Sequence, residues 1–318
     1  MNPSFRFIHL AIHFCMAVLM KKTRKPLDPT TARKWSDIGH MAFIDALTSS
    51  AILKANQFAF HGGTSLHLSW QSPRFSEDLD FLLSKDMGEG MPEVMKRVGR
   101  RMLQILRASD PGFELEIREK TKAGSNLLDY MLIVSHKDVI GTAKVRAEFW
   151  QVEPGYLERY DTAFAYPAKD GDIVSRVSQP LPAATLEAAY ADKLTAFATR
   201  RHLKWRDVFD LWWIGRQVDI EPAAMADRFL HHVTAFNTYD GLPPADALRK
   251  FLERGHDEIV KEADPDLKKW LPPQLWNTLR GTGVEEMVAD VRASIEAIAG
   301  EIEARCPEVA EVVDGPGL

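Results

Sequence analysis

Two aspartates separated by a single leucine, Asp78 and Asp80, are the residues of this sequence best placed for chemistry. They open the apolar run Asp78-Leu79-Asp80-Phe81, which is typical of a β-strand, and alternate side chains of a strand project to the same face. Two carboxylates on one face repel each other unless a cation lies between them, and Mg²⁺ is commonly held by carboxylates together with substrate phosphates. The spacing predicts a magnesium site, with a solvent-exposed edge strand as the alternative.

A glycine pair precedes these acids in the run Phe60-His61-Gly62-Gly63-Thr64-Ser65. We expect a strand over 57–61 to end there and a helix to begin, with Thr64 or Ser65 as its cap. The free N–H groups and the dipole of a helix N-terminus bind anions. Most glycine pairs are only turns, and this one lacks the spacing of a Walker A loop or a Rossmann fingerprint. Beside an acid pair, it predicts a phosphate-binding site at Gly62, Gly63, Thr64 and Ser65.

A third acid, Glu148, lies in a later segment that alternates between apolar and charged residues. A strand over 142–150 would place Glu148 on the charged side, together with Lys144 and Arg146. Glu148 is therefore a candidate third metal ligand beside the two aspartates. The alternative is a solvated face on which the charges of one strand pair with each other, and the sequence leaves both open.

Two charged residues of the second half lie in strongly apolar helical segments. Lys193 falls on the apolar stripe of a helix expected over 185–201, and a lysine there must find an anion or lose its proton. A triphosphate would supply that anion, and a structural ion pair with Asp207 or Asp210 is the alternative. Asp207 itself is part of the site or of an ion-pair network between two helices, and Asp210 is either a member of the site or a structural pairing residue.

These motifs together resemble the AbiEii-type nucleotidyltransferases of the DNA polymerase β-like superfamily, the toxins of type IV toxin–antitoxin pairs. The resemblance spans residues 36–215 and rests on Gly62-Gly63-Thr64-Ser65-Leu66, on Arg74, Ser76 and Asp78-Leu79-Asp80-Phe81, on Lys193-Leu194-Thr195-Ala196, and on Arg206-Asp207-Val208-Phe209-Asp210-Leu211. It implies Mg²⁺, an NTP donor and a cognate antitoxin. The residues that it implies to be catalytic are Asp78, Asp80, Lys193 and Asp207. Glu148 would complete the acid set that holds the metal, and Lys193 would also contact the nucleotide.

The elements around the motifs predict an α/β (α+β) fold, with a polymerase β-like nucleotidyltransferase core that contains a mixed sheet and a following α-helical domain. Strands are expected over 113–120, 127–135 and 142–151, and helices over 35–54 and 92–108. Breakers such as Pro154-Gly155 make 152–184 rich in loops, and the pattern is helical afterwards. The expected boundaries are an N-terminal extension over 1–34, the core over 35–180, the helical domain over 181–306 and a tail over 307–318. The nucleotide is expected between the core and the helical domain.

Composition limits the partners. The chain has 318 residues, of which 45% are hydrophobic and 27% charged, and its net charge is −5. This charge excludes a broadly basic surface that coats nucleic acid, so RNA has to bind a local basic patch. The first candidate patch is Arg97, Arg100, Arg101 and Arg107, and the second is Arg200, Arg201 and Lys204. Cys15 and Cys306 lie at opposite ends without metal-ligand spacing, which is typical of a reducing cytoplasm.

The beginning of the chain is unusual. Residues 5–20 are apolar but too short to span a bilayer comfortably, and the basic cluster Lys21-Lys22-Thr23-Arg24-Lys25 follows the apolar run, whereas a signal peptide has its charges before it. We expect translation to start at Met20, and we expect no membrane partner.

The function expected from the resemblance is magnesium-dependent transfer of NMP from an NTP to RNA, with a tRNA 3′ end as acceptor, by the toxin of a toxin–antitoxin pair. The alternative within enzymes is transfer to a small-molecule or protein hydroxyl. The alternative from another class is a catalytically idle NTP-binding module, which the presence of both Asp78 and Asp80 disfavours.

Overall fold

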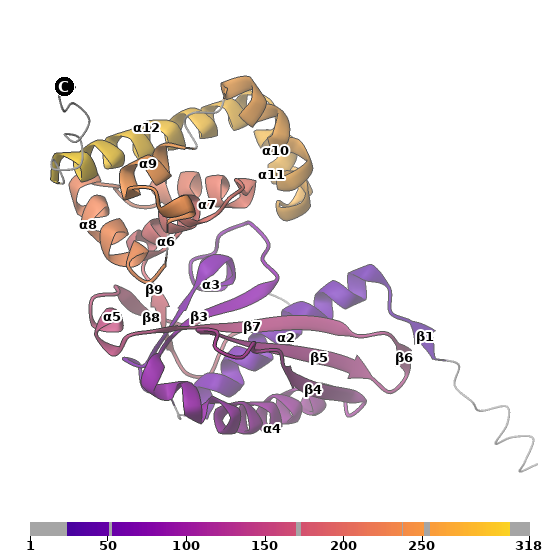
Figure 1. Cartoon of the computed structure of the whole chain (residues 1–318). Coiled ribbons are helices and arrows are strands. Elements are labelled where there is room, and N and C mark those ends of the chain that lie inside the picture. The colour runs from indigo at the N-terminus through magenta and orange to yellow at the C-terminus, as the bar shows by residue number, and fades with distance from the viewer. Residues whose placement is uncertain (1–23, 51–52, 170–172, 237, 251–254, 306–318) are drawn as a thin grey trace, which may run out of the picture.

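The computed structural model describes residues 24–50, 53–169, 173–236, 238–250 and 255–305. The expected start at Met20 and both cysteines lie outside these residues. Within them, a seven-stranded mixed sheet lies between two helices on one side and a group of helices on the other (Figure 1). No helix of the described residues has the length and apolar character needed to cross a membrane.

The sheet has the strand order β4-β5-β7-β3-β2-β9-β8. Its strands are β2 (Phe58–His61), β3 (Asp78–Ser84), β4 (Phe113–Glu119), β5 (Leu127–His136), β7 (Ala143–Val152), β8 (Thr162–Ala165) and β9 (Leu181–Ala184). The pairs β3–β7 and β2–β9 are parallel, and the other neighbours are antiparallel. A small parallel pair, β1 (Lys25–Pro26) with β6 (Val139–Ile140), lies outside this sheet.

The register gives the centre of the sheet one apolar and one polar face. Phe81 pairs with Phe60 on one side and Phe149 on the other, and the rings stack with centroids 5.1 and 4.8 Å apart. One residue earlier, Asp80 pairs with His61 and Glu148. Because paired residues share a face, the acids lie opposite the phenylalanine layer.

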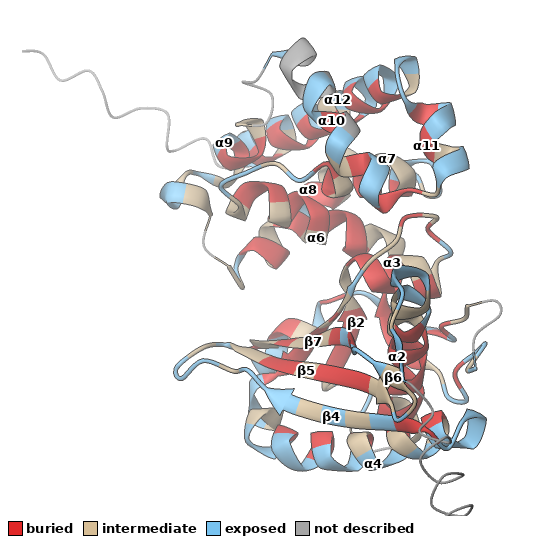
Figure 2. Cartoon of the chain, turned by 90° about the vertical axis from the view of Figure 1, so that its right-hand side faces the viewer, coloured by how far each residue is buried: buried red, intermediate tan, exposed pale blue. Residues whose placement is uncertain are grey.

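Two long helices cover the apolar face: α2 (Pro29–Ser49) and α4 (Met91–Ser109). α2 begins at Pro29 because Asp28 caps it, with Asp28 Oδ1 accepting from the Thr31 amide at 3.0 Å. α4 buries residues such as Val98 and Met102 against the sheet and exposes its basic side to solvent (Figure 2). The arginines of α4 therefore lie on the opposite side of the sheet from Asp78 and Asp80.

The other helices lie on the polar side. They are α3 (Gly62–Ser69), α5 (Pro154–Glu158), α6 (Leu186–Thr199), α7 (Trp205–Gly215), α8 (Pro222–Val233), α9 (Pro244–Arg249), α10 (His256–Trp270), α11 (Pro273–Leu279) and α12 (Thr282–Arg305). Short 3₁₀ helices occupy Lys85–Gly90 and Tyr239–Gly241. Ala59, Leu82 and Ala184 of the sheet join Leu194 and Phe209 of the helices in one buried cluster. This shared core holds α6 and α7 over the sheet.

The predicted α/β fold with a mixed sheet is confirmed, as are the strands expected over 113–120, 127–135 and 142–151. The leading helix begins and ends earlier than expected, at Pro29 and Ser49. The segment expected to be rich in loops, 152–184, also contains α5 and two strands that were not expected, β8 and β9, which complete one end of the sheet. Both are four-residue strands among breakers, and β9 contains Pro182, so neither carries a clear strand pattern.

Candidate active site

The acids Asp78, Asp80 and Glu148 line one cleft of about 430 Å³ between the polar face of the sheet and the helices above it. Asp78 and Asp80 project from β3, and β7 supplies Glu148 as the register partner of Asp80. Its other lining residues include His61, Gly62, Gly63, Arg74, Ser76, Arg146, Asp192, Lys193, Ala196, Arg200, Lys204, Arg206 and Asp207. The structure thus brings all the sequence-predicted acids together.

These acids carry negative charge that the protein compensates only in part. Burial, followed by the charge of Asp80, raises the pKa of Asp78. Burial and the same charge raise the pKa of Glu148 to about 7, although Arg146 opposes this effect. The Arg146 guanidinium lies 2.7 Å from Glu148 Oε1 and 2.6 Å from Asp129 Oδ2. Glu148 therefore lies beside the two aspartates, as expected for a third metal ligand. It also pairs with Arg146 of its own strand, as expected for the alternative interpretation.

The acid pair suits a hard cation that takes its remaining ligands from elsewhere. In the described residues, no three His, Cys, Asp or Glu side chains are grouped so that they could hold a metal ion on their own. Mg²⁺ does not need such a group, because it keeps waters and binds substrate phosphates. Asp78 and Asp80 fit this kind of site, because they supply oxygen ligands and because a cation between them would relieve their mutual repulsion.

The glycine turn packs directly against the acids. Gly62 follows β2 with a φ of 75°, which favours glycine, and a Cβ atom at Gly62 would collide with the Asp80 side chain. A Cβ at Gly63 would collide with the Arg74 guanidinium and come within 2.8 Å of Ser76 Oγ. Only glycines therefore let the start of α3 approach the cleft this closely.

Thr64 and Ser65 do not cap α3, so this expectation was wrong. α3 begins at Gly62, before both residues, and its N-cap residue His61 makes no side-chain cap hydrogen bond. The Thr64 hydroxyl donates to the Asp78 carbonyl, and the Ser65 hydroxyl donates to the Phe60 carbonyl at 3.1 Å. Both hydroxyls point into the protein and tie α3 to β2 and β3, so their backbone N–H groups are the atoms left for an anion.

Lys193 is at the centre of a buried ion-pair cluster on the helical side of the cleft. Its Nζ lies 3.0 Å from Asp207 Oδ1 and 2.8 Å from Asp210 Oδ2. Arg74 donates two hydrogen bonds of 2.7 Å to Asp210, and Arg200 pairs with Asp207. Burial would raise the pKa of Asp207, but the cations Lys193 and Arg200 outweigh it and lower that pKa to about 2. Three cations face two carboxylates, which leaves one positive charge at the cleft.

The geometry can be compared with known proteins. A family model described as the nucleotidyl transferase AbiEii toxin of type IV toxin–antitoxin systems matches residues 45–280, most of the 318-residue chain. The chain belongs to the AbiEii family. It is thus a nucleotidyltransferase of the toxin–antitoxin class, whose substrate is an NTP and whose partner is a cognate antitoxin.

Solved structures agree with this fold. MenT4, a nucleotidyltransferase toxin from Mycobacterium tuberculosis H37Rv, is 19% identical, with 86% of this chain and 90% of that chain covered and a TM-score of 0.52. A candidate nucleotidyltransferase from H. pylori is also 19% identical, with 84% and 96% covered and a TM-score of 0.50. At these identities the likeness concerns the fold alone. A comparison with curated proteins finds no match.

The AbiEii chain has a buried hydrogen-bond centre that the sequence did not predict. Asp192, next to Lys193 on α6, lies 3.1 Å from His61 Nδ1 and 3.0 Å from His232 Nδ1, and accepts a 2.6 Å hydrogen bond from the Tyr160 hydroxyl. Burial would raise the pKa of Asp192, but the two histidines hold it well below its usual range. This contact joins the residue before Gly62 to the residue before Lys193. The adjacency of Asp192 to Lys193 was the only sequence signal for it.

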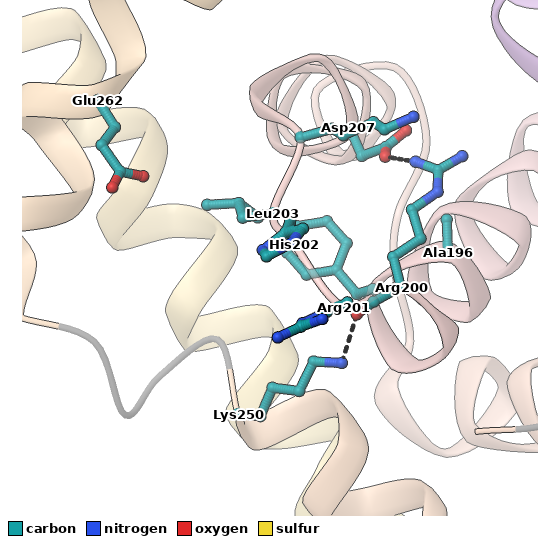
Figure 3. Close-up of a pocket in the computed structure, with 10 residues that line it drawn as sticks. Ala196, Arg200, Arg201, His202, Leu203, Asp207, Lys250 and Glu262 are labelled. Atoms are coloured by element: carbon teal, nitrogen blue, oxygen red, sulfur yellow. Dashed lines mark hydrogen bonds and ion pairs between the residues drawn. The ribbon is translucent and has the colours of Figure 1, made fainter. Parts of the chain in front are cut away.

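Two further cavities adjoin the cleft. A helical-side cavity of about 310 Å³ shares Ala196, Arg200, Lys204 and Asp207 with the cleft. Figure 3 shows Arg200 reaching Asp207 while Lys250 Nζ donates to the Arg200 carbonyl at 2.6 Å. A sheet-edge cavity of about 420 Å³ shares Ser76, Asp78 and Arg146 with the cleft.

The first candidate patch for RNA lies elsewhere. Arg97, Arg100, Arg101 and Arg107 belong to α4, below the sheet. Arg97 lies 3.7 Å from Glu93, and Arg107 donates to the Phe113 carbonyl at 3.1 Å. RNA bound to α4 would not lie beside Asp78 and Asp80. The second patch, Arg200, Arg201 and Lys204, does line the helical-side cavity.

Proposed function

We propose that this AbiEii toxin transfers NMP from an NTP to RNA, with a tRNA 3′ end as acceptor, in a magnesium-dependent reaction. One observation supports the proposal above the others. The same cleft has an undercompensated pair of acids on the sheet and a buried cluster with excess positive charge on the helices. These two surfaces match the two parts of a metal–triphosphate complex.

The sheet side would hold the metal. Asp78 and Asp80 would be its protein ligands, with Glu148 beside them on β7. Bound Mg²⁺ would orient the triphosphate and lower the pKa of an attacking hydroxyl. The backbone N–H groups at the start of α3, from Gly62 to Ser65, would bind phosphate oxygens, because a helix N-terminus attracts anions. The collision of any Cβ at Gly62 with Asp80 supports this role, since it keeps the turn next to the acids.

The helical side would neutralise the leaving pyrophosphate. Lys193 lines the cleft and would donate to phosphate oxygens as negative charge moves onto them. Asp207 contacts Lys193 and Arg200, and acts through them as a positioning residue. Asp210, which is fully buried between Arg74 and Lys193, contributes in the same way.

The test is a labelling experiment. The protein is incubated with each radiolabelled NTP, Mg²⁺ and total cellular RNA, with an Asp80→Asn protein in parallel. We expect label in the tRNA fraction with the wild type only. Label in protein or in small molecules would instead support transfer to another hydroxyl. NTP binding without label in any fraction would support the idle NTP-binding module.

A further inference from the structure

The sheet-edge cavity is rich in cations. Its walls come from α2, β5, β7 and the end of α10, and it meets the cleft at Asp78. Its basic residues are Arg33, Lys144, Arg146, Lys169 and Lys269. Its acidic residues are Asp37, Glu77 and Asp78. Cations therefore outnumber acids beside the proposed metal site, in a chain whose net charge is negative.

Two of these basic residues are available to bind an anion. Arg33 and Lys144 are exposed, and neither has an ion-pair partner among the residues that the structure describes. Lys169, in contrast, lies 2.8 Å from Asp37, and Lys269 is exposed at 4.0 Å from Glu77. An anion entering the cavity can therefore pair with Arg33 and Lys144 without breaking an existing contact.

The histidines of the cavity do not add charge at neutral pH. Burial lowers the pKa of His40 to about 4, and burial also lowers the pKa of His67. Their ring nitrogens lie 2.8 Å from the Glu77 carbonyl and 2.7 Å from the Ser72 carbonyl, so both rings are held in the wall. The field of the cavity is thus set by arginine and lysine.

The cavity also offers a flat cationic surface. The Arg33 guanidinium carbon lies 3.6 Å from the centre of the Phe75 ring, a cation–π contact that holds the group against the cavity wall. The Phe75 amide donates to the Trp270 carbonyl at 2.8 Å, and Lys269 lies 4.3 Å from the centre of the Trp270 ring. Nucleic-acid bases stack on such guanidinium planes, and neighbouring lysines contact phosphates.

The position of the cavity fits the geometry of the reaction. In phosphoryl and nucleotidyl transfer, the attacking and leaving oxygens lie roughly in line on opposite sides of the phosphorus. The groups proposed to bind the leaving pyrophosphate, Gly62, Gly63 and Lys193, line the cleft and are not among the lining residues of the sheet-edge cavity. The helical-side cavity joins the cleft through Arg200 and Asp207, beside Lys193, on the leaving-group side. The sheet-edge cavity joins the cleft through Ser76, Asp78 and Arg146, at the end of β3 that carries the acid pair, and it is the cavity left for the nucleophile.

We propose that the sheet-edge cavity binds the single-stranded 3′ end of the acceptor RNA, with Arg33 stacked on a base and Lys144 and Lys269 on phosphates. This assignment rests on the proposed function, because it locates the acceptor of that reaction. It also places the RNA away from α4 and from the patch at Arg200, Arg201 and Lys204, because none of these residues line the cavity.

The test compares two double variants with the same change of net charge. Arg33→Glu/Lys144→Glu alters the cavity, and Arg100→Glu/Arg101→Glu alters exposed positions on α4. Binding of a fluorescein-labelled single-stranded RNA is measured by anisotropy without NTP, across a salt series. We expect the cavity variant to bind at least roughly tenfold more weakly at low salt, because a stacking contact and a phosphate contact are both lost. The salt dependence of log K should be shallower by about 0.7, because one of these two contacts, that of Lys144, is to a phosphate. Its affinity for NTP with Mg²⁺, measured by calorimetry, is expected to stay within about twofold of wild type.

The outcomes separate this inference from the proposed function. Normal RNA binding and labelling by the cavity variant, or an equal loss in the α4 variant, overturns the cavity assignment while leaving the reaction intact. A wild-type protein that binds NTP but neither binds nor labels RNA overturns the acceptor itself, and the cavity assignment with it. If the double variant does not fold, Lys144→Gln, an exposed single change, gives the same comparison against Arg100→Gln.

Discussion

The two walls of the cleft handle buried charge in opposite ways. On the sheet, burial and the charge of Asp80 raise the pKa values of Asp78 and Glu148. Arg146 opposes this effect at both acids, and Arg206 also opposes it at Asp78. On the helices, the pKa of Asp207 is lowered to about 2 because Lys193 and Arg200 more than offset burial. The carboxylates of the sheet wall therefore repel one another, whereas both carboxylates of the helical wall are paired with cations, which exceed them by one.

Because of this difference in charge pairing, substitutions in the two walls should affect stability and ligand binding to different extents. Removing a charge from the sheet wall relieves repulsion, so the fold tolerates it and only ligand binding suffers. Removing a charge from the helical wall leaves a buried partner alone, which costs folding free energy. Substitutions in the two walls should consequently have different ratios of lost activity to lost stability.

The largest effect is expected from Asp80→Asn on the sheet wall. Loss of one carboxylate at the proposed metal site should lower NMP transfer at least about 100-fold, because electrostatic stabilisation of the transferring group is the main contribution of such a site. The melting temperature of the metal-free protein should stay equal or rise, since Asp78 and Glu148 lose a repulsive neighbour. Labelled-NTP transfer and thermal unfolding measure the two effects. Wild-type turnover by this variant would remove the metal site from Asp80.

The opposite pattern is expected from Asp210→Asn on the helical wall. Asp210 is fully buried and holds both Arg74 and Lys193, so its loss leaves two buried cations short of a partner. Breaking such a pair costs about 3–5 kcal/mol of unfolding free energy. Denaturant titration measures it, with Glu286→Gln on α12, an exposed position, as the control. A loss below about 1 kcal/mol would show that this cluster is solvated and not a structural centre.

Lys193→Met is expected to lower both NTP affinity and stability, with a loss of stability between those of Asp80→Asn and Asp210→Asn. The change keeps the apolar stem and removes a charge-assisted contact to phosphate, worth about 1.5–3 kcal/mol, so NTP affinity should fall roughly ten- to a hundredfold. Stability should fall less than in Asp210→Asn, because Arg74 and Arg200 still pair with the two carboxylates. Calorimetric titration with NTP and Mg²⁺ tests it. Unchanged affinity would assign Lys193 to structure alone.

Much of the site could be predicted because its signals are local. The alternation in β3 predicted that Asp78 and Asp80 share a face, and the alternation in β7 placed Glu148 on the charged side. The apolar setting of Lys193 predicted that it needs an anion, and the structure supplies Asp207 and Asp210. Each of these inferences uses the period of one strand or one helix.

The remainder depends on contacts between distant segments. Asp192 meets His61 across 131 positions, and Arg74 meets Asp210 across 136. No period within one element predicts such pairs, because they follow from the packing of α6 and α7 over the sheet. For the same reason the α4 arginines looked suitable for RNA, although α4 packs on the far face.

The smallest expected effect is a pH dependence that belongs to the sheet wall alone. The pKa of Glu148 rises from 4.5 to about 7 on folding, so between these values the folded protein holds more of the Glu148 proton than the unfolded chain. The contribution of Glu148 to the stability of the metal-free protein therefore falls as pH increases through this window. After allowance for partial exposure, the change is on the order of 1–2 kcal/mol. Thermal unfolding of wild type and Glu148→Gln from acidic to neutral pH measures it, and a variant with the same slope as wild type would show that Glu148 ionises as it does in water.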